Sequence, residues 1–217
     1  MSEPAPHGPT TAEIEAARKL FAGPCDFFWG AAAQDSLPPI SHLPEIAFAG
    51  RSNVGKSSLV NALTGRRTLA RVSASPGRTR QINFFDLAKT LCLVDLPGYG
   101  FAQVSKTMKQ DWQGLASAYL RGRPTLKRVY LLIDARHGVK DSDRETMKNL
   151  DKAAVSYRIL LTKSDQLKPA DIAKAIAAAE TVARQHGAAH PEVLATSSET
   201  GFGIPELRVE VAIAAKG

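Results

Sequence analysis

The segment Gly50–Ser57, with the sequence GRSNVGKS, combines residue types and spacing that suit the binding of a polyphosphate. It matches the pattern G-x-x-x-x-G-K-[ST] and directly follows the apolar run 46–49, so a strand is expected to lead into the loop. Its two glycines let backbone N–H groups approach the phosphates, while Lys56 adds a positive charge and Ser57 offers a hydroxyl to Mg²⁺. The alternative is a plain glycine turn between a strand and a helix, and the later motifs decide between the two.

A second motif ends the apolar run 91–95, where Asp95 and Gly98 form the pattern D-x-x-G. A carboxylate at the carboxyl end of a strand beside a phosphate loop can bind Mg²⁺ or hold a water on it, and we expect the water-holding role. Gly98 would turn a backbone N–H toward the γ-phosphate. Taken alone, a D-x-x-G is as often an ordinary turn, so its weight comes from its place after the phosphate loop.

Two further motifs select the base of the nucleotide. The run 157–161 leads into Thr162–Asp165, with the sequence TKSD, which is close to the pattern [NT]-K-x-D. The carboxylate of Asp165 can accept hydrogen bonds from the ring N–H and the exocyclic NH₂ of guanine, and adenine offers neither in that arrangement. Thr196–Ser198 follows another strand, where the backbone N–H of Ser198 could meet the guanine O6. The motifs therefore predict GTP as the ligand and disfavour an ATP-using kinase.

Apolar runs alternate with amphipathic stretches from residue 44 onward, which predicts an α/β fold with a mostly parallel sheet and helices on both faces. We expect six strands, at 45–49, 81–87, 91–95, 127–134, 157–161 and 191–195. We expect helices at 56–64, 107–121, 141–154, 169–186 and 204–215. Only residues 88–90 join the second strand to the third, which is too short for a parallel crossover, so the sheet should contain one antiparallel edge strand.

Residues 1–43 are expected to form an N-terminal extension, and residues 44–217 the GTP-binding domain. Pro, Gly and polar residues predict disorder up to about residue 10, after which a capping box at 10–13 starts one short helix. The aromatic cluster 27–29 lies outside any long periodic segment. It is interpreted as a flap packed on the domain, with an exposed partner-binding patch as the alternative.

The composition, with 44% hydrophobic and 23% charged residues, is typical of a globular protein, and no apolar run reaches the ~20 residues of a membrane span. The N-terminus has neither the basic start nor the apolar segment of a secretory signal, so we expect a cytoplasmic protein. The net charge of +7 favours a polyanionic partner, although a merely soluble basic surface explains it equally well. Cys25 and Cys92 have no metal-binding spacing and are expected to be thiols in or near the core.

Five segments together resemble the EngB (YihA/YsxC) family of bacterial ribosome-assembly GTPases. They are Pro44–Ser58, Ser75–Arg80, Asp95–Gly100, Thr162–Asp165 and Thr196–Ser198. The resemblance runs from about residue 44 to the C-terminus. It implies a Ras-like P-loop GTPase fold, binding of GTP and GDP with Mg²⁺, association with the large ribosomal subunit precursor and its rRNA, and a role in normal cell division and septation. We expect a monomer that binds neither a membrane nor DNA.

The same resemblance implies roles for individual residues. Ser57 and Thr79 would be the Mg²⁺ ligands, and Thr79 would join only when the γ-phosphate is present, which is how such a loop senses the nucleotide. The contacts expected to matter during hydrolysis come from Lys56, Thr79 and Gly98. The residues placed against the nucleotide are Gly50, Arg51, Ser52, Asn53, Val54, Gly55, Lys56, Ser57, Gly77, Arg78, Thr79, Arg80, Gln81, Asp95, Leu96, Pro97, Gly98, Thr162, Lys163, Ser164, Asp165, Thr196, Ser197 and Ser198.

The residue after D-x-x-G is Tyr99, where many small GTPases have a glutamine that orients the attacking water. Tyrosine has no carboxamide for this task, so we expect slow intrinsic hydrolysis and a protein that acts first as a switch. Asn53 lies where several related GTPases coordinate K⁺, which would place positive charge near the β/γ-bridge. Asn53 could instead cap the loop by bonding to its own backbone, and both interpretations stay open.

Three basic segments could couple nucleotide state to RNA binding. The expected first switch, 66–80, contains five arginines and no acidic residue, and a second mobile segment should run from Gly98 toward Lys109. A further basic cluster spans 121–128. Contacts to RNA phosphates would follow shape and charge rather than sequence, while solvated loops are the alternative. The other functional hypothesis is a nucleotide-gated binding module in a division or membrane-associated pathway, with incidental hydrolysis.

Overall fold

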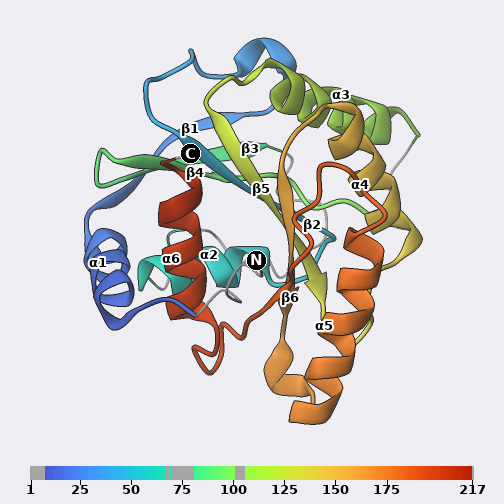
Figure 1. The fold of residues 1–217 in the computed structure, drawn as a ribbon. Coiled ribbons are helices and arrows are strands. Elements are labelled where there is room, and N and C mark those ends of the chain that lie inside the picture. The colour runs from blue at the N-terminus through green and yellow to red at the C-terminus, as the bar shows by residue number, and fades with distance from the viewer. Residues whose placement is uncertain (1–7, 67–68, 70–80, 101–105, 217) are drawn as a thin grey trace, which may run out of the picture.

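The computed structural model of the protein describes residues 8–66, 69, 81–100 and 106–216, with the side chains of 106–113 left out. Its strands and helices alternate along the chain, apart from the consecutive strands Ile82–Leu87 and Leu91–Asp95 (Figure 1). The helices are α1 (Thr11–Ala22), α2 (Lys56–Thr64), α3 (Lys106–Gly122), α4 (Asp141–Lys152), α5 (Pro169–Ala183) and α6 (Ile204–Ala214), with short 3₁₀ helices at Gln34–Ser36 and Ser164–Gln166. The strands are β1 (Cys25–Ala31), β2 (Glu45–Gly50), β3 (Ile82–Leu87), β4 (Leu91–Asp95), β5 (Leu126–Asp134), β6 (Tyr157–Thr162) and β7 (Leu194–Ala195).

The strands form one sheet in the order β1-β3-β4-β2-β5-β6-β7. From β4 to β7 all neighbours are parallel, while β3 pairs antiparallel with both β4 and β1. The predicted hairpin between the second and third strands is confirmed as β3 and β4. The mostly parallel α/β sheet is therefore confirmed, but the described residues give it seven strands rather than six, and the antiparallel edge is β1.

Strand β1 is the strand that the sequence did not predict. Its residues Phe27, Phe28 and Trp29 remain 53%, 45% and 41% exposed, and β1 lies at the edge of the sheet. Phe27 still contacts the ring of Phe85 on β3, edge to face, at a centroid distance of 5.8 Å. The interpretation of this cluster as a flap packed on the domain is wrong, since it is part of the main sheet.

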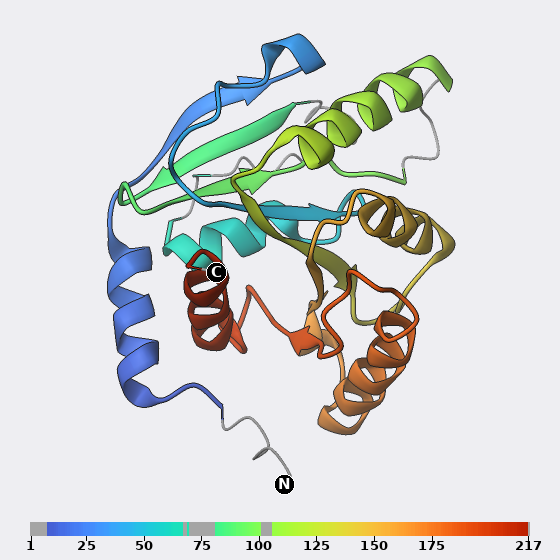
Figure 2. The ribbon, with the colours of Figure 1, turned by 45° about the horizontal axis from the view of Figure 1, so that its top comes forward.

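Helices cover both faces of the sheet, as predicted (Figure 2). On one face α1, α2 and α6 enclose a core that includes Phe21, Leu59, Leu63, Leu207 and Val211. On the other face α3, α4 and α5 enclose a core that includes Leu115, Tyr119, Met147, Leu150, Ala179 and Val182. Burial of these side chains is the main force that fixes the helices, and through them the loops at the strand ends.

The ends of several elements depart from the sequence expectations by a few residues. Helix α1 begins with the predicted capping box, in which Thr10 and Glu13 satisfy each other's backbone N–H groups. The strand expected at 191–195 is reduced to β7, and α5 ends three residues before the predicted 186. Cys25 and Cys92 are both buried free thiols. No helix in the described part of the chain is long and apolar enough to span a membrane.

Candidate functional site

The sheet topology brings the predicted motifs to one edge. Strands β4, β2, β5, β6 and β7 are parallel neighbours, so their carboxyl ends lie side by side. Register pairs Phe48 with Asp95, and Leu161 with Ala195. The phosphate loop after β2, the D-x-x-G after β4, the TKSD segment at the end of β6 and the TSS segment after β7 therefore meet where ligands bind in open α/β sheets.

The phosphate loop has the backbone that its glycines predict. A Cβ atom at position 50 would lie 2.8 Å from Val54 Cγ1 and 3.0 Å from Leu132 Cβ, so only glycine fits there. Gly55 has φ of +101° and caps the N-terminus of α2 without a side-chain hydrogen bond. The first N–H groups of α2 thus remain available to an anion, and the helix dipole adds to their attraction. This arrangement fits the phosphates of a nucleotide.

Lys56 and Asp95 form an ion pair between their Nζ and Oδ1 atoms. Both side chains are buried, since Lys56 is 8% exposed and Asp95 is 2% exposed. The sequence assigned Lys56 to the β/γ-phosphates and Asp95 to a water on Mg²⁺, and it did not anticipate that the two would pair. The structure therefore couples the phosphate loop to the D-x-x-G motif through one buried contact.

The two base-recognition segments are joined by hydrogen bonds around Asp165. Its carboxylate accepts from Ser197 Oγ at 2.6 Å and from Gln166 Nε2 at 2.7 Å. The bond from Ser197, and to a smaller extent the bond from Gln166, holds the pKa of Asp165 below its ordinary value. The exposed side chain is therefore an ionised acceptor at neutral pH. Backbone contact from Ser164 N to Thr196 O, at 3.1 Å, fixes the two loops together.

Buried hydroxyls attach the same segments to the rest of the site. Thr162 Oγ1 donates to Val54 O in the phosphate loop at 2.7 Å, and Thr196 Oγ1 donates to Leu161 O at 3.0 Å. Ser164 is buried, and among the described residues its Oγ has no hydrogen-bond partner. The sequence had grouped Thr162 and Thr196 with the nucleotide contacts, whereas the structure places their hydroxyls on protein carbonyls.

The side chain of Tyr99 reaches the start of α4. Its hydroxyl donates to Asp143 Oδ1 at the start of α4, at 2.8 Å, and the ring is buried. Burial, and then the neighbouring carboxylate, raise the pKa of Tyr99 well above its ordinary value, so the phenol stays protonated. Its backbone pairs with the phosphate loop, because Ser52 N donates to Tyr99 O at 2.9 Å and Tyr99 N donates to Gly50 O at 3.2 Å. Tyr99 thus positions the D-x-x-G turn.

Replacement of Tyr99 by phenylalanine is expected to lower stability but to leave the rate of GTP hydrolysis unchanged. The variant keeps the buried ring and removes the donor to Asp143, which leaves a buried carboxylate oxygen unsatisfied at a cost of about 1–3 kcal/mol. Urea unfolding measures the first effect and single-turnover hydrolysis the second. A fall in rate of about tenfold or more, which is ~1.4 kcal/mol of barrier, would show instead that the hydroxyl acts on the reaction.

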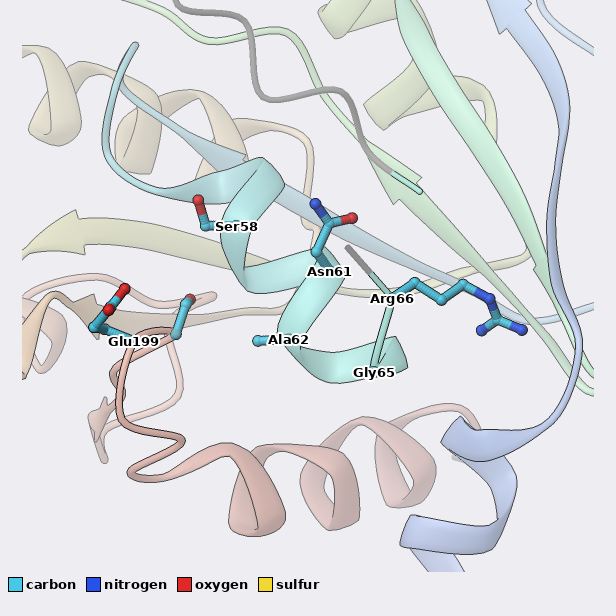
Figure 3. A pocket seen from close by; sticks show the side chains of 7 residues that line it. Ser58, Asn61, Ala62, Gly65, Arg66 and Glu199 are labelled. Carbon is cyan, nitrogen blue, oxygen red and sulfur yellow. The ribbon is translucent and has the colours of Figure 1, made fainter. Parts of the chain in front are cut away.

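A groove of about 360 Å³ lies between α2 and the loop that follows β7 (Figure 3). It is lined by Ser58, Asn61, Ala62, Gly65, Arg66, Ser198 and Glu199. Ser198 is the one lining residue that the sequence assigned to the nucleotide. The groove therefore borders the base-recognition end of the site, and the phosphate loop Gly50–Lys56 is not part of its wall.

Some of the predicted nucleotide contacts lie outside the described residues, and others contact groups of the protein itself. Gly77, Arg78, Thr79 and Arg80 are outside the described part of the chain, and Gln81 is exposed before β3, where it donates to Asn83. Asn53 is exposed with φ of +62°, and its backbone carbonyl accepts from Lys163 Nζ at 2.8 Å. Within the described residues, no three His, Cys, Asp or Glu side chains gather as a metal site.

Asp134, at the end of β5, is a residue of this edge that the sequence analysis missed. Its carboxylate contacts Lys163 Nζ at 3.1 Å and accepts two side-chain hydrogen bonds from Arg136. It could have been found by the criterion that selected Asp95, because it is an acidic residue that ends an apolar strand of the parallel sheet.

Comparison with known proteins agrees with these features. Residues 45–163 match the family described as "50S ribosome-binding GTPase". The chain is 59% identical over 212 residues to the "Probable GTP-binding protein EngB" of Gluconobacter oxydans (strain 621H), covering 98% of this chain and 93% of the relative. It is 58% identical over 202 residues to the protein of the same name in Caulobacter vibrioides (strain NA1000 / CB15N), covering 93% and 88%.

Solved structures show the same fold. The crystal structure of a probable GTP-binding protein engB aligns with a TM-score of 0.64 at 23% identity, over 79% of this chain and 98% of that one. Era, in complex with MgGDPNP and nucleotides 1506–1542 of 16S ribosomal RNA, aligns with a TM-score of 0.63 at 20% identity, over 79% and 56%. Both the sequence matches and the assembled site lead to one assignment. The chain belongs to the EngB (YihA/YsxC) family of P-loop GTPases, and it binds GTP and hydrolyses it to GDP.

Proposed function

We propose that this GTPase is a slow, nucleotide-gated switch that acts in assembly of the large ribosomal subunit. The observation that carries the switch role is Tyr99, whose hydroxyl is bound to Asp143 instead of facing the phosphates. A side chain held in this way cannot orient an attacking water, so hydrolysis depends on groups outside the turn. A protein of this kind remains in its GTP-bound form long enough to control a binding partner.

Mg²⁺ fits the proposed site by the chemistry of its oxygen donors. Ser57, in the first turn of α2, would supply a hydroxyl to the metal, and Thr79 would supply a second when the γ-phosphate is present. Asp95 would hold a metal-bound water once its pairing with Lys56 has been replaced by a phosphate. Bound Mg²⁺ would neutralise charge on the β- and γ-phosphates, while Lys56 and the first N–H groups of α2 position them.

The ribosomal role is supported by the family description as a ribosome-binding GTPase and by the net charge of +7. Within the predicted basic cluster at 121–128, the four basic side chains differ in exposure. Arg123 is buried in an ion pair with Glu45, and Arg128 Nη1 lies 3.3 Å from Glu210 Oε2, so neither guanidinium is fully exposed to solvent. Arg121 and Lys127 are exposed. We propose that these two residues contribute to contacts with rRNA phosphates in the cytoplasm, through a monomeric protein that engages neither membrane nor DNA.

Capture of ribosomal particles by the tagged protein tests this proposal. With a non-hydrolysable GTP analogue, large-subunit precursors should be retained more strongly than with GDP, and rising salt should release them because phosphate contacts displace counterions. The variant R121Q/K127Q should retain less than K168Q/K174Q, which removes the same charge from exposed positions on and beside α5. If the amount of retained ribosomal particles depends neither on the nucleotide nor on the salt concentration, the proposal is contradicted.

Depletion of the protein separates assembly from a role in division alone. We expect immature large subunits to accumulate on sedimentation before septation fails, since the division defect would follow from lost translation. Normal ribosomal profiles together with a septation defect would favour a nucleotide-gated module of a division or membrane-associated pathway.

Hydrolysis is expected to be faster in K⁺ than in Na⁺ if the Asn53 side chain holds a monovalent cation near the phosphates. The matched variant is Asn53→Gly, since glycine accepts the φ of +62° and the carbonyl bound by Lys163 is kept. Single-turnover rates in the two salts check this. Equal rates in K⁺ and Na⁺ for the parent protein would leave Asn53 as a loop-shaping residue only.

A further inference from the structure

Lys163 connects the two halves of the nucleotide site. It follows β6 with φ of +57°, a left-handed conformation that costs a non-glycine residue energy. From there its side chain reaches Asn53 O in the phosphate loop at 2.8 Å and lies 3.8 Å from the position of a Cβ on Gly55. A long lysine side chain has many rotamers, so a contact of this kind needs a second partner to hold it in place.

Asp134 provides that second partner. In the sheet register it lies directly opposite Thr162, one residue before Lys163, while β5 extends two residues beyond the last pairing with β2 at Leu132. Its side chain is 13% exposed, and its Oδ2 atom lies 3.1 Å from Lys163 Nζ. The carboxylate thus contacts the lysine that links the base-recognition segment to the phosphate loop.

Arg136 holds the Asp134 carboxylate in its orientation. Its Nε donates to Oδ1 at 2.9 Å and its Nη2 donates to Oδ2 at 2.7 Å, while its backbone N–H donates to Oδ1 at 3.1 Å. Burial would raise the pKa of Asp134, but the bonds from Arg136 and Lys163 outweigh it and keep the pKa well below its ordinary value. The group is therefore ionised at all physiological pH values, and its attraction for the lysine is permanent.

We propose that Asp134 is a positioning residue for guanine-nucleotide binding, which acts by fixing Lys163 against the phosphate loop. The inference rests on the nucleotide placement proposed above. Without the carboxylate, Lys163 would keep one neutral carbonyl as partner, and the loops that hold the base and the phosphates would move independently. Bound nucleotide then escapes more readily, because either half of the site can open alone.

Dissociation of a fluorescent GDP analogue from the full-length protein in Mg²⁺ buffer tests this. We expect D134N, which keeps the shape and removes the charge, to release the analogue about tenfold faster than the parent protein. The matched control D171N removes an exposed carboxylate paired with Lys174 on α5 and should leave the rate unchanged. R136Q removes the other partner of Asp134 and should have a smaller effect than D134N, because the contact with Lys163 remains.

A double-mutant cycle separates positioning from a general structural role. If Asp134 acts through Lys163, D134N should add nothing to K163M, and the double variant should dissociate GDP at the rate of K163M. Additive effects, or equal losses in thermal stability for D134N and R136Q with no change in dissociation, would overturn the inference. A parent protein that fails to bind the GDP analogue would instead overturn the nucleotide placement itself, so the two failures can be distinguished.

Discussion

Replacement of Asp165 by asparagine is expected to weaken GDP binding by about a thousandfold and to create affinity for xanthosine diphosphate. The carboxylate is exposed, ionised and oriented by Ser197 and Gln166, which leaves acceptor positions directed at a base. Loss of two charge-assisted hydrogen bonds, at about 1.5–3 kcal/mol each, gives the expected factor. The amide introduced by D165N can donate to the carbonyl that xanthine carries where guanine has its NH₂ group, so the preference should reverse.

Competition between the two diphosphates for the protein, followed with a fluorescent nucleotide, measures this reversal. The control Ser197→Ala keeps the carboxylate but removes the donor at 2.6 Å, so it should weaken GDP binding by a smaller factor without creating xanthosine binding. D171N, on the exposed face of α5, should bind like the parent protein. If D165N prefers GDP over xanthosine diphosphate as strongly as the parent protein does, the base is recognised elsewhere, for instance in the groove beside Ser198.

Much of the scaffold could be predicted from the sequence because it depends on local pattern. Short, mostly apolar runs between turn signals correspond to β2, β4, β5 and β6, since the central strands of a parallel sheet are buried on both faces. The same reasoning placed the motifs at one sheet edge, because parallel strands share their carboxyl ends. Strand β1 was missed because an edge strand exposed along its length has neither alternation nor a continuous buried run.

Pairwise contacts across the site could not be predicted from the sequence. Lys56 and Asp95 are 39 residues apart, and Tyr99 and Asp143 are 44 apart, so no spacing rule relates them. Asp134 was overlooked because it belongs to no motif, although it ends a strand between two that do. The residue types identified which groups could bind a nucleotide. Only the three-dimensional arrangement showed which of these groups form ion pairs and hydrogen bonds with other side chains.

The buried pair of Lys56 and Asp95 leads to the second large effect. In protein stripped of nucleotide and metal, Lys56→Met should lower the free energy of unfolding by about 3–5 kcal/mol, because the Asp95 carboxylate is left buried without its partner. The variant K56M/D95N should recover most of this loss, since it removes both charges and retains similar volumes. Urea unfolding in EDTA measures the three free energies.

The affinity for GDP should differ between the single variants Lys56→Met and Asp95→Asn, although each of them breaks the same ion pair. A phosphate must compete with Asp95 for the Lys56 ammonium, so Asp95→Asn should bind GDP in EDTA at least as tightly as the parent protein. K56M lacks the cation and should bind about a hundredfold more weakly, which corresponds to ~2.7 kcal/mol for one charge-assisted contact to phosphate. A loss of GDP affinity in D95N as large as that in K56M would mean that the pair acts as a unit in holding the loop's shape. A GDP affinity that falls in K56M but not in D95N would show that Asp95 binds the Lys56 ammonium only until a phosphate replaces it.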